Sequence, residues 1–298
     1  MKNLLTEWRK YQKRILQEDA DPAKLDPGRF PIKLSDVVPK AAQTYAKTGA
    51  PELDKAKDDD TIPVANGERP VGTLKPSQTS MMMEKAMAFV LQMLSSAAGG
   101  PGKLSAGGDL GAFISNDDYI MDGHHRWIAT GMINPALSVG GYIVDWPGEQ
   151  LVAVLNTITK GKLGVMQGKP ASGGFDQFNE GMVRQWLMQY LKKGVWGNMS
   201  PEDALKAVEK FTGQKGEAAI EPAVQKIVQN LGSLTLAAPS WAPARPDMPV
   251  IDDKKTGVAA KALAQGEIDV NKPYGVGAHI AAKKAAPKQK LKQPLPKE

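Results

Sequence analysis

The sequence contains no cysteine, and this absence excludes several kinds of chemistry at once. Without cysteine the chain can form no disulfide, no thiolate nucleophile and no thiolate metal site, and the composition fits a reducing compartment. Uninterrupted runs of 18 apolar residues are also missing, so we expect no contact with a membrane. The first 18 residues are too charged for the apolar core of a signal peptide. We therefore expect a cytoplasmic protein.

Excess charge of one sign is confined to one end of the chain. The formal net charge is +6, and residues 281–298 alone contain six lysines and one glutamate. The remaining sequence is therefore close to neutral, so the positive charge is located in a tail and does not indicate a basic binding surface. A composition of lysine, proline and alanine is typical of a solvated, disordered segment. The alternative is an electrostatic tether to nucleic acid or to an acidic partner.

Composition and hydrophobic periodicity divide the 298 residues into four parts. Residues 1–60 predict an N-terminal amphipathic helix followed by an irregular, proline-rich arm. Residues 61–160 alternate between strand and helix patterns, which predicts a compact α+β domain with a small mixed sheet and packed helices. Residues 175–232 predict an all-helical appendix, and residues 233–298 predict an extended proline-rich segment that leads into the basic tail.

Local signals place the elements of the α+β domain. An Asn-Gly pair at 66–67 predicts a turn between two extended pieces. Residues 80–97 predict a helix with Ser80 as its N-cap. A predicted hairpin with its turn at 116–117 leads into a helix over 124–133. A strand is predicted at 138–146, and further helices at 148–158, 175–193, 200–211, 217–231 and 257–265.

The stretch YIMDGHHRWIAT, residues 119–130, holds two of the three histidines in the chain. A strand ends there, Gly123 permits a tight turn, and a helix begins. Backbone N–H groups at a helix start are unpaired and attract anions. Three consecutive donor side chains oppose the helix dipole at this position, which indicates a bound anion. The alternative is structural: Asp122 serves as an N-cap, and both histidines pack or face solvent.

The same residues make a poor zinc site. His124 and His125 are neighbours on a helix, so their side chains point about 100° apart. No third histidine or cysteine ligand lies nearby, and a dedicated zinc site is not expected. Asp122 could instead cap the helix, orient an imidazole, or bind a metal on a phosphate. Trp127 follows the cluster, and we expect its ring to anchor the helix in the core.

Together with PVGTLKPSQTSM at residues 70–81, this stretch resembles the ParB/sulfiredoxin-like superfamily. In that fold an extended first box precedes a helix, and a short hairpin then leads to a DGHHR-type box that opens the next helix. The resemblance covers roughly residues 62–158. The segment ARPDMPVI at 244–251 also resembles a recurrent end piece of phage-encoded ParB-like proteins.

The resemblance implies a site for the phosphates of a nucleotide or of nucleic acid, with ATP, ADP and CTP all open as ligands. It implies that phosphate oxygens are contacted by Gly123, His124, His125, Arg126, Lys75, Ser77 and Gln78. It also implies catalytic roles for Asp122, His124 and His125, with Asp122 as the residue that would hold Mg²⁺. A phage-encoded member would act in the host cytoplasm or on the virion, alone, as a homo-oligomer, or with an assembly partner.

Departures from the family narrow the function. Sulfiredoxin needs a cysteine, so that activity is excluded. The CTP-dependent clamps carry a helix-turn-helix domain that is not evident here. The free-serine kinases place a glutamate base in the first box, where this chain has Gln78, which cannot accept a proton from a hydroxyl. Two hypotheses stay open: a phosphate-site enzyme (a nuclease, nucleotide hydrolase or phosphotransferase), and a non-catalytic DNA-binding or assembly protein.

Overall fold

The computed structural model describes residues 61–161, 173–245, 248–249, 251 and 255–266. The predicted N-terminal arm (1–60) and the basic tail (281–298) lie outside these residues. Within them the chain forms seven α-helices and a five-stranded mixed sheet, which confirms the α+β class. None of the described helices is both long and apolar enough to cross a membrane.

The five-stranded sheet has the order β1-β6-β4-β5-β2. Its strands are β1 (Val64–Pro70), β2 (Lys75–Pro76), β4 (Gly108–Ser115), β5 (Tyr119–Asp122) and β6 (Ser138–Val144). β1 runs antiparallel to β6, β6 parallel to β4, β4 antiparallel to β5, and β2 parallel to β5. Because β2 and β5 are parallel, the residues that follow Pro76 and Asp122 leave the sheet at the same edge.

Side chains alternate between the two faces of this sheet, and each face carries its own hydrophobic cluster. On β4, Ala112 and Ile114 belong to one cluster, while Phe113 between them belongs to the other. On β5, Ile120 and Met121 divide in the same way. The sheet is therefore a layer between two cores.

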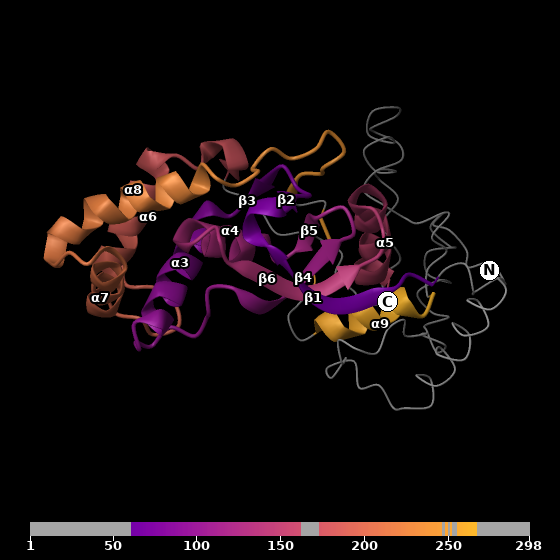
Figure 1. The fold of residues 1–298 in the computed structure, drawn as a ribbon, viewed down its shortest axis with the longest axis horizontal. Helices are drawn as coiled ribbons and strands as arrows, with labels where there is room; N and C mark the ends of the chain where they lie inside the picture. Colours follow the sequence, from indigo (N-terminus) through magenta and orange to yellow (C-terminus); the bar gives the residue numbers. More distant parts are fainter. Residues whose placement is uncertain (1–60, 162–172, 246–247, 250, 252–254, 267–298) are drawn as a thin grey trace.

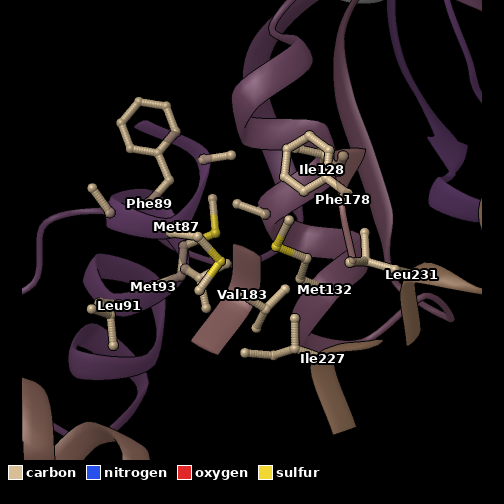
Figure 2. Close-up of a cluster of buried hydrophobic side chains, with 14 of the residues drawn as sticks. Met87, Phe89, Leu91, Met93, Ile128, Met132, Phe178, Val183, Ile227 and Leu231 are labelled. Carbon is tan, nitrogen blue, oxygen red and sulfur yellow. The ribbon is translucent and has the colours of Figure 1, made fainter. Parts of the chain in front are cut away.

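The larger core holds five helices on one side of the sheet (Figure 1): α3 (Met83–Ala97), α4 (His124–Ile133), α6 (Glu180–Lys193), α7 (Pro201–Thr212) and α8 (Ile220–Leu231). Figure 2 shows Met87 of α3, Met132 of α4, Val183 of α6 and Ile227 of α8 converging in it. The helices of residues 175–232 thus share one core with α3 and α4. The smaller core lies under α5 (Gly148–Gly161) and α9 (Thr256–Ala264).

The predicted turn at residues 66–67 is wrong. β1 runs through this Asn-Gly pair without interruption, and Gly67 pairs with Gly141 of β6. Seven residue pairs join the two strands. Backbone hydrogen bonds to a partner strand distant in sequence therefore outweigh the local turn preference of Asn-Gly.

The predicted start of the helix over 80–97 is also wrong. α3 begins at Met83, and Ser80–Met81 instead form β3, which pairs with β7 (Gly173–Gly174). No side chain caps α3. The hydroxyl of Ser80 accepts the backbone N–H of Arg245 at 3.3 Å, so its hydrogen-bonding capacity serves a tertiary contact. The helix over 124–133 and the hairpin before it are confirmed.

Candidate functional site

The site is built on the turn between β5 and α4. Gly123 is the N-cap residue of α4, with φ 98°, and no side chain caps the helix. A Cβ at this position would lie 3.1 Å from the Cβ of Ala112, so glycine is required by both conformation and space. The N–H groups of Arg126 and Trp127 both donate to the Gly123 carbonyl at 2.9 Å. The alternative in which Asp122 is the N-cap is therefore wrong.

His124 joins the first box to the start of α4. The backbone N–H of Ser77 donates to Nε2 of His124 at 3.3 Å, and the Ser77 hydroxyl donates to the Ile120 carbonyl at 2.7 Å. Because Nε2 accepts this bond, the proton of the neutral ring lies on Nδ1. Burial, with a smaller contribution from the charge of Arg245, lowers the pKa of His124 from 6.5 to about 3. The imidazole of His124 and the hydroxyl of Ser77 thus already have hydrogen-bond partners within the protein.

His125 has a different environment. Its side chain is buried, yet its Nε2 atom has no hydrogen-bond partner within the described part of the chain. Burial, followed by the positive charges of Arg245 and Lys85, holds the pKa of His125 well below its usual value. The imidazole also contacts the ring of Phe89 edge-on, with centroids 6.2 Å apart. A buried polar nitrogen without a partner costs about 1–3 kcal/mol, which a ligand oxygen could recover.

Gln78 is the second buried polar group without a partner. It is 1% exposed and follows Ser77 in the chain, and its Nε2 amide has no hydrogen-bond partner among the described residues. Gln78 thus carries a buried, uncharged donor without a partner, one residue after the contact between Ser77 and His124. Neutral donors of this kind can bind phosphate oxygens without the repulsion that two more cations would add.

Asp122 and Arg126 form an ion pair across Gly123. The Asp122 carboxylate lies 3.5 Å from Nη2 of Arg126, and both side chains are largely buried. The guanidinium lies over the first turn, where a Cβ on Gly123 would be 3.8 Å from Nη2. No cluster of three or more His, Cys, Asp or Glu side chains in the described ranges could hold a metal ion. Asp122 offers carboxylate oxygens, which suit a Mg²⁺ ion carried in on substrate phosphates.

Arg245 was not predicted as a site residue. It ends the strap of residues 233–245, which returns from α8 to the first box (Figure 1). Thr79 donates its N–H to the Pro243 carbonyl at 2.9 Å, next to the bond between Arg245 and Ser80. After burial, the charge of Arg245 is the largest cause of the lowered pKa of both His124 and His125. The segment ARPDMPVI was a signal in the sequence, but it did not indicate which side chain reaches the site.

The structure does not bring Lys75 to the start of α4. Lys75 pairs with Tyr119 at the beginning of β5, and its Nζ lies 4.3 Å from the centroid of the Tyr119 ring. Asp122 is at the opposite end of the same strand. Lys85 of α3, which carried no prediction, instead acts on the pKa of His125.

Trp127 anchors α4 as expected. Its indole Nε1–H donates to the Val71 carbonyl at 3.0 Å, and its ring is fully buried. The start of α4 is therefore fixed against the first box by two contacts, the Trp127 indole and the His124 imidazole.

Comparison of the chain with protein-family models, with curated proteins and with solved structures finds no match.

Proposed function

We propose that this protein has a ParB-like fold and binds the phosphate group of a nucleotide or of nucleic acid at the start of α4. The observation that carries the proposal is His125, a buried, neutral imidazole whose Nε2 has no partner among the described residues. It lies at the N-terminus of a helix, where backbone N–H groups attract anions. Positive charge surrounds this imidazole: after burial, the charges of Arg245, Lys85 and Arg126 contribute to its lowered pKa.

The donors divide by charge. The neutral donors are the first-turn N–H groups that precede Arg126, the Gln78 amide, and the imidazole of His125 in its Nε2-protonated tautomer. Positive charge comes from Arg126 and Arg245. Asp122 partly balances this charge, since its carboxylate pairs with Arg126 and opposes the burial that lowers the pKa of Arg245. A phosphate would compete with Asp122 for these guanidinium groups. Each charge-assisted hydrogen bond gained contributes about 1.5–3 kcal/mol.

An enzymatic role as nuclease, nucleotide hydrolase or phosphotransferase would place catalysis mainly on electrostatics. The arginines would stabilise charge on the phosphoryl group, and Asp122 would hold a Mg²⁺ ion that supplies Lewis-acid chemistry when bound. Gln78 offers no carboxylate base. Glu84 of α3 is a better substitute for the missing base than Glu68, because the charge of Glu84 acts on Arg245, whereas Glu68 lies on β1 opposite Gly140. Binding without turnover is the second candidate, which the missing first-box glutamate favours.

Binding is tested with inorganic pyrophosphate, ATP, ADP, CTP and a short DNA oligonucleotide, by calorimetry and thermal shift at low salt. His125→Phe keeps a ring but removes Nε2, and we expect it to weaken binding about tenfold or more. Arg245→Gln should weaken binding by a similar factor. Lys75→Ala is the matched control, because its ammonium lies over Tyr119 and binding should not change. A wild-type protein that binds none of these ligands would refute the proposal.

Turnover separates the two candidates. ATP, CTP and DNA hydrolysis are measured with and without Mg²⁺ in the wild type and in Asp122→Asn. An enzyme should lose its activity in this variant while it still binds pyrophosphate, because the ion pair with Arg126 is broken but the donors remain. Binding without Mg²⁺-dependent turnover in the wild type would support the non-catalytic candidate.

A further inference from the structure

Trp196 is the one large hydrophobic side chain that is strongly exposed in the described part of the chain, at 51%. It lies on the turn between α6 and α7. Single exposed apolar residues are common, so exposure alone carries little weight. The construction of the turn and the residues beside the indole carry the argument.

The turn holds Trp196 in a fixed place. Val195 and Met199 pair as an isolated bridge, with the Val195 N–H donating to the Met199 carbonyl at 2.9 Å. Gly194 continues the chain at φ 75°, a conformation that favours glycine. The buried side-chain amide of Gln92 donates to the Trp196 carbonyl at 2.6 Å and so fastens the turn to α3.

A row of side chains on α3 connects this turn with the phosphate site. Lys85, Phe89 and Gln92 are spaced along one face of the helix. The rings of Phe89 and Trp196 meet edge-on with centroids 5.3 Å apart, and Phe89 in turn contacts His125 at 6.2 Å. The indole is therefore at most 11.5 Å from the imidazole. The Lys85 ammonium lies 5.2 Å from the Phe89 centroid, and its charge also lowers the pKa of His125, after burial and Arg245.

We propose that the Trp196 ring stacks on the base of a nucleotide, or of a single nucleic-acid strand, whose phosphate binds at the start of α4. The inference rests on the proposed function and deepens it, from a phosphate ligand to one that carries a base within reach of that phosphate. Every nucleobase has a π-face, so a rigidly held, exposed indole is a suitable platform. Lys85 lies close to Phe89, so its ammonium can attract the negative charge of the bound ligand.

A protein partner fits the same surface less well. A specific protein interface buries about 800 Å² on each side and has an apolar centre. Trp196 is a single exposed ring that contacts Phe89, and the Lys85 ammonium lies 5.2 Å from the centroid of the same Phe89 ring. One aromatic face next to positive charge matches the area and the charge of a nucleotide.

The test compares ligands with and without a base in the full-length protein. Affinities for pyrophosphate, ATP, CTP and a short single-stranded DNA are measured for the wild type, Trp196→Ala and Trp196→Phe. We expect Trp196→Ala to weaken base-containing ligands about five- to 150-fold and to leave pyrophosphate unchanged. Trp196→Phe should retain most of the affinity, because it keeps a stacking ring. A response of DNA alone would identify a nucleic-acid strand as the source of the base.

Several results would overturn the inference. If the wild type binds pyrophosphate as tightly as it binds ATP, CTP and DNA, stacking on a base contributes nothing to affinity. Unchanged nucleotide and DNA affinities in Trp196→Ala, with or without a change in oligomeric state, would also make it wrong while the phosphate site stands. If the affinity for pyrophosphate is the same in His125→Phe as in the wild type, the proposed function itself is wrong. Because Trp196 is exposed, the thermal midpoint of Trp196→Ala should stay near that of the wild type, which excludes unfolding as the cause.

Discussion

Acidification should destabilise this protein through the buried imidazoles at the start of α4. The pKa of His124 is about 3 in the folded state and 6.5 in an unfolded chain. Below pH 6.5 the unfolded chain therefore binds a proton that the folded protein does not. The contribution of His124 to stability is complete above pH 6.5 and is lost progressively as the pH falls toward 3. The slope is about 1.36 kcal/mol for each pH unit.

Between pH 7 and pH 5, His124 alone should lower the free energy of unfolding by about 2 kcal/mol. The pKa of His125 is shifted in the same direction, for the same main reason of burial, so its loss adds to that of His124. Either loss is a large fraction of the free energy of unfolding of a typical domain, which is about 5–15 kcal/mol.

Urea unfolding of the wild type and of His124→Gln at both pH values isolates this contribution. The Gln side chain can still accept the N–H of Ser77 but does not titrate in this range. The variant should lose about 2 kcal/mol less than the wild type between pH 7 and pH 5. Carboxylates and the other histidines contribute equally to both proteins and cancel. Equal losses in the two proteins would mean that His124 titrates near 6.5, which contradicts its burial.

Two further predictions concern backbone fit and helix capping. Gly123→Ala should destabilise more than Gly213→Ala, because both glycines have positive φ but only Gly123 has a neighbour, Ala112, in the way of a Cβ. The shared conformational cost is about 1–2 kcal/mol, and equal values in urea unfolding would refute the steric contribution. Ser200→Ala should cost about 1 kcal/mol, since Ser200 and Asp203 form a capping box at α7. Ser200→Asp should retain most of that stability, and a thermal midpoint as low as that of the alanine variant would argue against a capping role.

Elements set by local signals were predictable from the sequence. α4 begins where a glycine turn meets an apolar helical pattern, and α7 begins at Ser200, as its capping residues indicate. Elements set by distant partners were not. Gly67 remains in a strand because Gly141 pairs with it, and Ser80 forms a strand because residues 173–174 lie beside it. Neither partner can be recognised from the sequence around 66 or 80.

The candidate site divides in the same way. Ser77 and His124 were both expected to contact a phosphate, but the hydrogen bond between them was not predicted. Arg245 reaches the site through a bond between Thr79 and Pro243, residues 164 positions apart. Lys75 was expected at the site, but the direction of its side chain toward Tyr119 depends on strand register. Side-chain direction and long-range contact are the two properties that local patterns do not contain.

The two adjacent histidines look equivalent in sequence, yet they have different roles in the structure. Neighbours on a helix point about 100° apart, so they cannot face the same group. His124 turns toward Ser77 and accepts its N–H, which fixes the first box against α4. His125 turns toward Phe89 and keeps a buried nitrogen without a partner among the described residues. The two side chains thus have different surroundings, although burial is the main reason why the pKa of each lies below its usual value.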